Sequence, residues 1–367
     1  MNLNSIASLI NLLNIKRVGP QKVRSLVSAH KNPAEVFSLS TREICAVNGV
    51  DLKTARAIRK AVHFDFGPAE VEKAEKLDVE LITFWDDEYP FLLRKMYDPP
   101  VILYRKGQPL KKKEDCIAMV GSRITTSYGR KVAQNLAGDL VKYGITIVSG
   151  LARGIDSISH KQTVDSRGRT IAVLGSGVDV LYPPENKVLA EKIEENGTII
   201  SEFFLGTKPN AGNFPKRNRI ISGLAHGTVV IEAGDKSGAI LTALNAVDQN
   251  REVFSVPGRI FDKQSLGCLR LIRNGAIPVQ NAGQILNHVK NRLFKTLRPR
   301  QKNISLDLSR EEKIVVSKLH HEPIHIDDLV SNTGMELTHM LTILLELELK
   351  GVVQQLSGKQ FVLGVSF

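Results

Sequence analysis

The sequence predicts an α/β protein built around a Rossmann-like, doubly wound parallel sheet, with a small helical domain before it and a winged helix after it. Three observations predict this order: glycine-punctuated helical repeats at the start, apolar runs alternating with amphipathic segments in residues 106–289, and three helical patterns followed by a hairpin at the end. Apolar strands that alternate with helices are typical of a parallel sheet buried on both faces. Ligands of such sheets bind beyond the carboxyl ends of the strands.

The chain carries a surplus of basic residues. Among its 367 residues, 50 are Lys or Arg and 38 are Asp or Glu, which gives a formal net charge of +12. A positive field of this kind attracts polyanions such as nucleic acids. The alternative is a basic cytosolic protein whose charge serves no partner. The distribution of the charge along the chain must decide between the two interpretations.

The cysteines and the apolar runs indicate the compartment. Cys45, Cys116 and Cys268 lie far apart and form no Cys-x-x-Cys pair, which argues against a disulfide framework and a zinc knuckle. The first 15 residues are interrupted by Asn and lack the apolar centre of a signal peptide. No run approaches the ~20 apolar residues of a membrane span. The sequence therefore predicts a cytoplasmic protein with no membrane partner.

Residues 1–64 predict a helical domain of two helix-hairpin-helix (SAM-like) elements. Gly19 and Gly49 each separate two short helical patterns, and Lys and Arg follow each glycine. In such an element the glycine permits a tight turn whose backbone N–H groups can face a DNA phosphate. A helical bundle with glycine-ended helices explains the same pattern equally well.

Residues 65–105 predict a connector that packs on the core, and residues 106–289 predict the Rossmann-like domain. The connector contains Trp85 and several prolines. In the domain, each predicted strand is a short apolar run that ends in a turn of small residues. The predicted strands are 116–120, 145–148, 170–174, 198–200, 228–231 and 252–256.

Residues 290–303 predict a basic linker, and residues 304–367 predict the winged helix. The linker has six Lys or Arg and no acid, so it is either a tether with affinity for phosphate or merely a soluble one. The hairpin of the winged helix is predicted to turn at Ser357 and Gly358. The third predicted helix, 335–350, carries three Glu and one Lys. Carboxylates near phosphates weaken binding, so we do not expect this helix to read a DNA groove.

Four turns at the predicted carboxyl edge of the sheet have the composition of a ligand site. Each follows a predicted strand and is rich in small residues. Small residues let a ligand approach the backbone, and N–H groups at helix starts favour anions. Packing alone would explain one such turn, but four on one edge favour a binding site. The turns are 121–123, 149–156, 175–179 and 232–238.

The segment 214–219, Phe-Pro-Lys-Arg-Asn-Arg, predicts the anion-binding residues at this edge. Pro215 suits the first turn of a helix, where backbone N–H groups are free. The side chains of Lys216, Arg217 and Arg219 can then converge on one negative group. We expect that group to be a phosphate.

The sequence lacks the common signatures of cofactors and catalysis. Gly175-Ser-Gly177 misses the third glycine of G-x-G-x-x-G, and no G-x-x-x-x-G-K-[ST] occurs, so we expect no cofactor. Asp156 and His160 lie four residues apart on one predicted helix, but such a pair is more often structural than catalytic. No metal-ligand spacing occurs. The sequence predicts no catalytic residues and no metal.

A series of blocks in the Rossmann-like domain closely resembles the DNA-processing protein A family (DprA, also called Smf). The match covers this whole domain in order, and the flanking domains fit the family arrangement more loosely. Asn250 and Leu269 depart from the family pattern, which has Gly and Asn there, and these departures concern local turns only. The blocks are 120–123, 128–129, 147–156 with His160, 171–177, 182–183, 185–186, 201–202, 214–224, 237–238, 242–243 and 256–258.

The resemblance implies a bacterial protein that binds and protects single-stranded DNA and loads the RecA recombinase onto it during natural transformation, without catalysis. It also implies a homodimer formed through the Rossmann-like domain. The neighbouring turns add Ser122, Arg153 and Arg219 to the expected site. Phe214 is the candidate for base stacking, with core packing as an equal alternative. The family pocket residues carried over to this chain are Arg123, Ser149, Gly150, Lys161, Lys216, Arg217 and Asn218.

Two other functions remain as alternatives. The fold and its glycine-rich edge also resemble nucleoside-monophosphate phosphoribohydrolases, which carry a P-G-G-x-G-T-x-x-E block. The corresponding turn here begins at Ala233, and the helix after it has no acid before Asp248. A third interpretation is a scaffold whose winged helix binds proteins and whose core is only structural.

Overall fold

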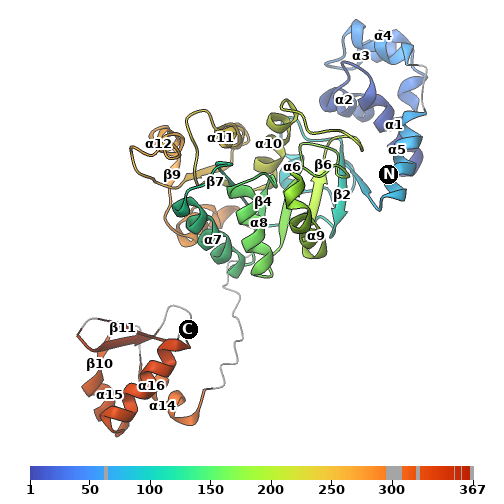
Figure 1. Cartoon of the computed structure of the whole chain (residues 1–367). Helices are drawn as coiled ribbons and strands as arrows, with labels where there is room; N and C mark the ends of the chain where they lie inside the picture. The colour runs from blue at the N-terminus through green and yellow to red at the C-terminus, as the bar shows by residue number, and fades with distance from the viewer. Residues whose placement is uncertain (62–64, 295–307, 320–322, 351, 357, 364–367) are drawn as a thin grey trace. The chain divides into compact units, whose positions relative to one another are not determined.

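The computed structural model describes residues 1–61, 65–294, 308–319, 323–350, 352–356 and 358–363 (Figure 1). Its contacts divide the chain into two compact units, Met1–Arg300 and Gln301–Phe367. The first unit holds the predicted helical and Rossmann-like domains, and the second holds the predicted winged helix. The predicted linker falls largely on residues 295–307, which lie outside the described part of the chain.

The N-terminal helices form the two predicted helix-hairpin-helix elements. Asn2, Ser40 and Asp51 each accept a hydrogen bond from a backbone N–H in the first turn of the helix that follows, which fixes where these helices begin. Lys22 Nζ donates to Thr54 Oγ1 at 2.6 Å and joins the two elements. The helices are α1 (Leu3–Asn14), α2 (Pro20–His30), η1 (Glu35–Phe37), α3 (Thr41–Ala46) and α4 (Leu52–Lys60).

The two predicted glycine turns differ in their backbone. Gly49 has φ +83°, a left-handed conformation that glycine adopts at little cost. Gly19 has φ −95°, and Arg17 carries the left-handed conformation (φ +77°) in the first turn instead. The prediction that glycine makes both turns possible therefore holds for the second element only.

A nine-stranded sheet forms the centre of the first unit. Its strand order is β1-β2-β6-β5-β4-β3-β7-β8-β9, so the chain changes direction across the sheet between β3 and β7. In this spatial order, the seven strands β6, β5, β4, β3, β7, β8 and β9 pair in parallel, as predicted. The parallel strands are β3 (Cys116–Val120), β4 (Thr146–Ser149), β5 (Thr170–Val173), β6 (Thr198–Ser201), β7 (Gly227–Val230), β8 (Glu252–Ser255) and β9 (Ile277–Pro278).

The six predicted strands are confirmed to within one residue at each end. The segment 65–105, in contrast, does more than connect. Besides α5 (Phe66–Lys76) and α6 (Phe91–Arg94), it supplies β1 (Glu80–Thr83) and β2 (Ile102–Gly107). These extend the sheet, because β2 pairs antiparallel with β6 and β1 pairs antiparallel with β2. Both strands are short, and β2 lies between Pro100 and Pro109, which is why the sequence predicts a connector here and not an extension of the sheet.

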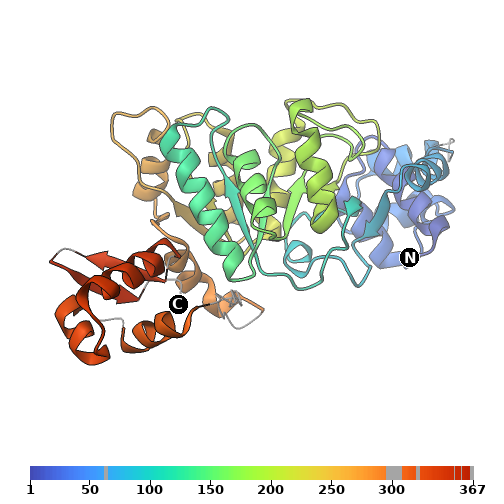
Figure 2. The same cartoon turned by 60° about the horizontal axis from the view of Figure 1, so that its bottom comes forward.

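Helices cover both faces of the sheet (Figures 1 and 2). One face packs against α7, α8, α9 and α13, and the other against α6, α10, α11 and α12. This arrangement confirms the predicted doubly wound fold. The helices are α7 (Ser127–Lys142), α8 (Ile155–Asp165), η2 (Pro184–Asn186), α9 (Lys187–Asn196), α10 (Asn213–Leu224), α11 (Gly238–Asp248), α12 (Leu266–Arg273), α13 (Ala282–Val289) and η3 (Lys290–Arg292).

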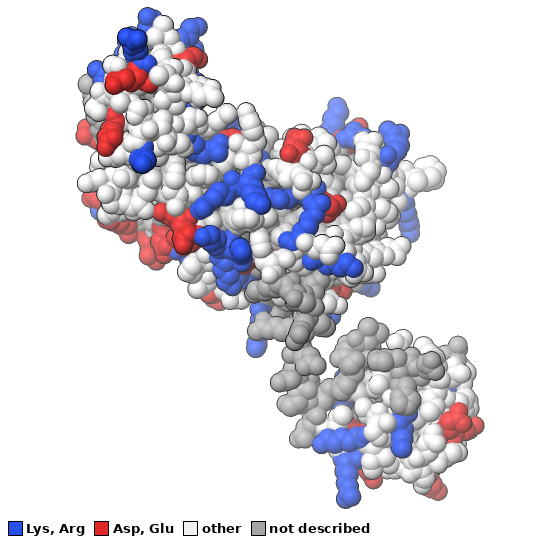
Figure 3. Space-filling view, turned by 180° about the vertical axis from the view of Figure 1, so that it is seen from behind, with Lys and Arg blue, Asp and Glu red and all other residues white. Residues whose placement is uncertain are grey.

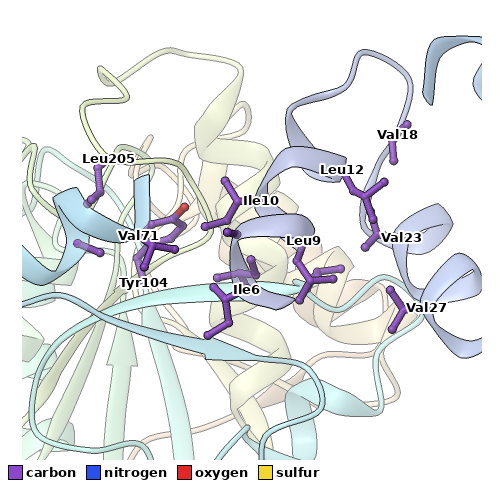
Figure 4. Close-up of a cluster of buried hydrophobic side chains, with 14 of the residues drawn as sticks. Ile6, Leu9, Ile10, Leu12, Val18, Val23, Val27, Val71, Tyr104 and Leu205 are labelled. Carbon is purple, nitrogen blue, oxygen red and sulfur yellow. The ribbon is translucent and has the colours of Figure 1, made fainter. Parts of the chain in front are cut away.

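The helical domain and the edge of the sheet share one hydrophobic cluster (Figure 4). Leu9 and Ile10 of α1 are fully buried in this cluster, which also contains Val71 of α5, Tyr104 of β2 and Leu205 after β6. Burying a side chain of this size stabilises the fold by about 1.5–3 kcal/mol. The N-terminal helices are therefore an integral part of the first unit.

The second unit is a winged helix with its own core. The third helix matches the prediction closely, and the predicted turn at Ser357 falls partly outside the described residues. Its described elements are α14 (Arg310–Lys318), β10 (Ile324–His325), α15 (Ile326–Thr333), α16 (Leu337–Leu349), β11 (Val353–Leu356) and β12 (Gln360–Leu363). Within the described residues of the whole chain, no helix has the length and apolar character needed to cross a membrane.

Candidate functional site

A pocket opens at the carboxyl ends of β3, β4 and β5, where the sequence predicts ligand binding. Four of the predicted site residues, Arg123, Gly150, Arg153 and Phe214, are in its wall. We call this the carboxyl-edge pocket. The full lining is Arg123, Gly150, Ala152, Arg153, Gly175, Ser176, Tyr182, Pro183 and Phe214.

Phe214 organises the pocket wall. It lies in the first turn of α10, half-buried, with the guanidinium of Arg123 5.2 Å from its ring centroid. The centroid of the Tyr182 ring lies 6.1 Å from the Phe214 centroid, and the two ring planes are tilted by 42°. Tyr182 lies in the loop that follows β5. Gly175 permits this packing, because a Cβ there would lie 2.8 Å from the Phe214 ring. The pocket thus combines two aromatic rings with a solvent-exposed cation.

Arg217 lies beneath the pocket instead of inside it. Its side chain is only 4% exposed, and its Nη1 donates to the carbonyls of Gly150, at 2.6 Å, and Val173. It therefore ties the ends of β4 and β5 together. A Cβ on Gly150 would lie 2.4 Å from the guanidinium, so only glycine leaves room for this brace. Arg217 supplies positive charge from below and fixes the backbone that lines the pocket.

A buried carboxylate accompanies this buried cation. Asp156 in the first turn of α8 accepts a hydrogen bond from the Gly150 N–H at 3.1 Å. Burial raises the pKa of Asp156, and the charge of Arg217 opposes that rise. Burial lowers the pKa of Arg217 to about 10, so it remains protonated at neutral pH. The two charges offset part of each other's desolvation cost.

The three cations of α10 do not converge, contrary to the prediction. Lys216 is exposed, Arg217 points into the core, and Arg219 pairs with Glu202 and donates to the Asp98 carbonyl on the side of α6. Helical geometry turns Arg217 away from Lys216 and Arg219, because residues one or two positions apart on a helix project in different directions. Lys216 and Arg219 share a face, but Glu202 and the Asp98 carbonyl hold the Arg219 guanidinium. Arg219 is therefore held away from the carboxyl-edge pocket.

The other predicted polar residues serve the loops around the pocket. The Ser122 hydroxyl donates to the Ile124 carbonyl at 2.7 Å, and the Ser149 hydroxyl donates to the Met119 carbonyl at 2.6 Å. Asn218 accepts from Arg217 Nε at 3.2 Å and donates to the Gly238 carbonyl at 3.3 Å. Lys161 is exposed on α8 and is not among the residues that line the pocket. These contacts show how the loops are shaped.

Arg153 is the second exposed cation of the pocket, and it already has an anionic partner. Its Nε pairs with Glu185 of η2, which raises the pKa of Arg153 and lowers that of Glu185. Both side chains are exposed, so the pair contributes little to stability. An incoming phosphate would have to replace Glu185 at Arg153.

Sequence reasoning missed Tyr182 as a site residue, and it placed Glu232 in a candidate binding turn although the structure gives that residue another role. Tyr182 belongs to a block that the resemblance singles out, yet only the folded chain brings it beside Phe214. Glu232, at the end of β7, is 4% exposed and accepts hydrogen bonds from the backbone and the hydroxyl of Thr126, where α7 begins. The carboxylate thus satisfies the N-terminus of α7.

Asp156 and His160 form no catalytic pair. His160 is fully buried, and its Nδ1 lies 2.7 Å from the Thr170 hydroxyl, which itself donates to the Ile147 carbonyl at 2.7 Å. Burial lowers the pKa of His160 to about 3, so the ring is neutral in the folded protein. A buried neutral ring without access to the pocket has no role in proton transfer there.

We expect His160 to make the free energy of unfolding depend on pH. Its folded pKa of about 3 lies below its ordinary value of 6.5, so the unfolded chain takes up a proton below pH 6.5 and the folded chain does not. The free energy of unfolding should therefore fall as pH drops, by roughly 2 kcal/mol between pH 6.5 and about 5. Urea denaturation of the wild type and of a His160→Gln variant measures this slope. Equal slopes in the two proteins would contradict the assignment.

Metal binding and the hydrolase alternative find little support in the geometry. Within the described ranges, no three His, Cys, Asp or Glu side chains are grouped so that they could hold a metal ion. On α11, which follows the turn that corresponds to the hydrolase block, the single acid is Asp248 at the last residue. The phosphoribohydrolase block would require a carboxylate near the start of this helix.

The fold and the pocket define a class: a Rossmann-like protein with an aromatic and cationic pocket at the carboxyl edge, preceded by a helix-hairpin-helix tandem and followed by a winged helix. Family models match each part, namely the DNA recombination-mediator protein A model over residues 80–290, the DprA winged helix domain over 299–359 and the SAM-like helix-hairpin-helix tandem over 9–63. The chain belongs to the DNA recombination-mediator protein A (DprA/Smf) family.

Known relatives cover most of the chain. Protein Smf of Synechocystis sp. is 35% identical over 327 residues, which are 79% of this chain and 82% of that protein. The X-ray structure of DprA from Streptococcus pneumoniae superposes with a TM-score of 0.67 at 32% identity and covers 78% of this chain and 98% of that one. A DprA structure from Helicobacter pylori, described for its single-stranded DNA binding mode, has a TM-score of 0.52 at 28% identity over 58% of this chain and 97% of that one.

The names of the two DprA structures describe DNA processing and, for the Helicobacter pylori protein, binding of single-stranded DNA. The structure also explains one departure from the family pattern. Asn250 follows α11 with φ +55°, a left-handed conformation that Asn tolerates better than most residues, so it can replace Gly there. Leu269 is half-buried on α12.

Proposed function

We propose that this chain binds single-stranded DNA at the carboxyl-edge pocket and serves DNA uptake and recombination in natural transformation. The observation that carries the proposal is the arrangement of Arg123, Phe214 and Tyr182. Single-strand binding proteins combine cations that track the phosphates with aromatic rings on which bases stack. Arg123 and Arg153 supply the cations here, and the two rings supply the stacking surface.

A preference for single strands follows from this chemistry. Stacking on Phe214 or Tyr182 requires an unpaired base, which duplex DNA does not offer. The helix that would enter a major groove, α16, carries Glu346 and Glu348. Two carboxylates on this helix would face the phosphates and weaken duplex binding.

Affinity for oligo(dT) and for blunt duplex DNA at two salt concentrations tests the proposed function. We expect the single strand to bind more tightly. Contacts with four to six phosphates should give a log–log salt slope of roughly −3 to −4, at ~0.7 per phosphate. Equal or tighter binding of the duplex would contradict the proposal, whereas release of ribose phosphate from AMP would favour the hydrolase alternative.

We further propose that the DNA-bound protein loads the RecA recombinase onto the single strand. This step is inferred from the family, and the pocket residues Arg123 and Phe214 would supply its DNA-binding part. The test is RecA filament formation on single strands covered by a competing binding protein, with wild type and with an Arg123→Ala variant. Filament formation that is indifferent to both proteins would contradict the role.

The predicted homodimer has a candidate interface on the Rossmann-like core. On α11, Leu241, Leu244 and Val247 are 45%, 50% and 61% exposed, and Phe261 in the loop before α12 is 90% exposed. Exposed apolar side chains grouped on one helix in this way are typical of an interaction site. We propose that a second copy of the chain covers this apolar face.

Sedimentation velocity of a Leu244→Glu/Val247→Glu variant tests the dimer. Introducing four carboxylates into a two-fold interface should raise the dissociation constant by at least about 100-fold, since each buried unpaired charge costs several kcal/mol. The matched control is Val188→Glu, an equally exposed apolar residue (62%) on α9. A dimer that survives the double substitution, or one lost in the control, would place the interface elsewhere.

A further inference from the structure

A second basic surface lies at the opposite edge of the sheet from the carboxyl-edge pocket. It consists of the exposed cations Lys95, Lys112, Lys113 and Arg292 and the half-buried Arg251. Lys112 and Lys113 precede β3, and Arg251 precedes β8, so both segments mark the amino ends of parallel strands. Figure 3 shows Lys and Arg side chains gathered in a band across the core. We call these five residues the amino-edge cluster.

Two phenylalanines hold the amino-edge cluster together. The rings of Phe91 and Phe294 meet edge to face with centroids 5.7 Å apart. Lys95 Nζ lies 4.3 Å from the Phe91 centroid, and Lys113 Nζ lies 5.9 Å from the Phe294 centroid. The Phe91 N–H donates to the Lys112 carbonyl at 2.8 Å. Segments from three parts of the chain therefore present their cations on one surface.

The arginines join the same surface through backbone contacts. Arg251 Nη2 donates to the Leu92 carbonyl at 2.9 Å, and Arg292 Nη1 donates to the Asn250 carbonyl at 3.0 Å. These bonds anchor one edge of each guanidinium, while the Arg251 Nε has no hydrogen-bond partner within the described part of the chain. Burial lowers the pKa of Arg251, and the nearby charge of Arg292 lowers it further.

Acidic side chains offset this positive charge only in part. Lys112 pairs with Asp87 at 2.7 Å, and Arg292 pairs with Glu252 at 2.7 Å. At least one side chain of each pair is exposed, so a phosphate can easily replace the carboxylate as the partner of the cation. Among the ion pairs of the described residues, none involves Lys95, Lys113 or Arg251. The amino-edge cluster thus retains a net positive charge.

We propose that the amino-edge cluster is a second nucleic-acid contact, which binds the phosphate backbone of the single strand outside the carboxyl-edge pocket. The proposal rests on the proposed function and extends its binding path. The strands between the two edges are four or five residues long, so the sites are separated by roughly 17 Å of sheet plus the loops. A single-stranded DNA molecule that occupies both sites must be much longer than one that fills only the carboxyl-edge pocket.

The chemistry favours a phosphate backbone over an acidic protein. Lysines on flexible stems bind phosphates as point charges without a fixed geometry, which suits sequence-independent contacts. The aromatic rings are already covered by Lys95 and Lys113, so the cluster offers little stacking and reads no base. It would therefore add affinity and length dependence to a strand whose bases are held in the pocket.

Oligonucleotide length separates the two sites. The test variant is Lys95→Gln/Lys113→Gln/Arg292→Gln in the full chain. All three side chains are exposed, and substitutions on the surface rarely unfold a protein. Affinity is measured for oligo(dT) of about 6 nucleotides, which fills one site, and of about 40 nucleotides. We expect an unchanged dissociation constant for the short strand. For the long strand we expect a rise of about tenfold and a salt slope smaller by roughly 2, at ~0.7 per lost phosphate contact.

The matched control removes the same charge elsewhere. Lys131→Gln/Lys142→Gln/Lys192→Gln changes three exposed lysines on α7 and α9, none of which belongs to the amino-edge cluster. It should leave the length dependence intact. An equal loss in the control, or no loss for the long strand in the test variant, would overturn the proposal. If wild type binds neither strand, the proposed function fails as well, so the two failures are distinguishable.

Discussion

The Arg217→Ala variant is expected to lose about 3–5 kcal/mol of stability, because two buried carbonyls lose their hydrogen-bond donor and the buried Asp156 loses the positive charge that compensates it. Asp156 would keep its buried carboxylate, and the carbonyls of Gly150 and Val173 would lose their donor. Chemical denaturation followed by circular dichroism measures the change. DNA affinity should also fall, since the backbone that lines the pocket loses its brace.

A second-site variant tests the cause of that loss. Asp156→Asn removes the uncompensated charge, so Arg217→Ala/Asp156→Asn should recover part of the stability that Arg217→Ala loses. Arg217→Lys keeps the charge without the planar fork and should lie between wild type and Arg217→Ala. A free energy of unfolding within about 0.5 kcal/mol of wild type in Arg217→Ala would show that the buried arginine is dispensable.

The Arg123→Ala/Arg153→Ala variant is expected to keep its fold and lose most of its affinity for single-stranded DNA. Both side chains are exposed in the wall of the carboxyl-edge pocket, so their removal leaves no buried group unsatisfied. Each charged hydrogen bond to phosphate contributes about 1–3 kcal/mol. Together the two substitutions should raise the dissociation constant by more than about 100-fold, which is ~3 kcal/mol. Fluorescence anisotropy with labelled oligo(dT) measures the change.

Two companion variants sharpen this result. Glu185→Gln frees Arg153 from its ion pair and removes a negative charge near the path of the phosphates, so affinity should rise several-fold. Lys192→Ala removes an exposed cation on α9 outside the pocket and should leave affinity within about threefold. Native circular dichroism together with unchanged affinity in the double variant would mean that the DNA lies elsewhere.

Part of the site could be predicted from the sequence because local patterns determine it. The turns after the predicted strands contain Gly150 and Gly175, and the parallel arrangement requires those turns to meet at one edge. The cationic segment after Phe214 was also found. What the pattern could not give was direction, because Lys216, Arg217 and Arg219 leave α10 toward solvent, the core and Glu202 respectively.

The sequence by itself determined the parallel strands, the doubly wound order and the edge of the sheet at which the candidate pocket opens, because apolar runs and glycine turns are local signals. Only the tertiary structure decided the rest. It added β1 and β2 to the sheet, placed Tyr182 beside Phe214 and gathered Lys95, Arg251 and Phe294 on one surface. The physical reason is that these contacts join residues far apart in the chain, and such contacts depend on packing and long-range pairing that no local pattern encodes.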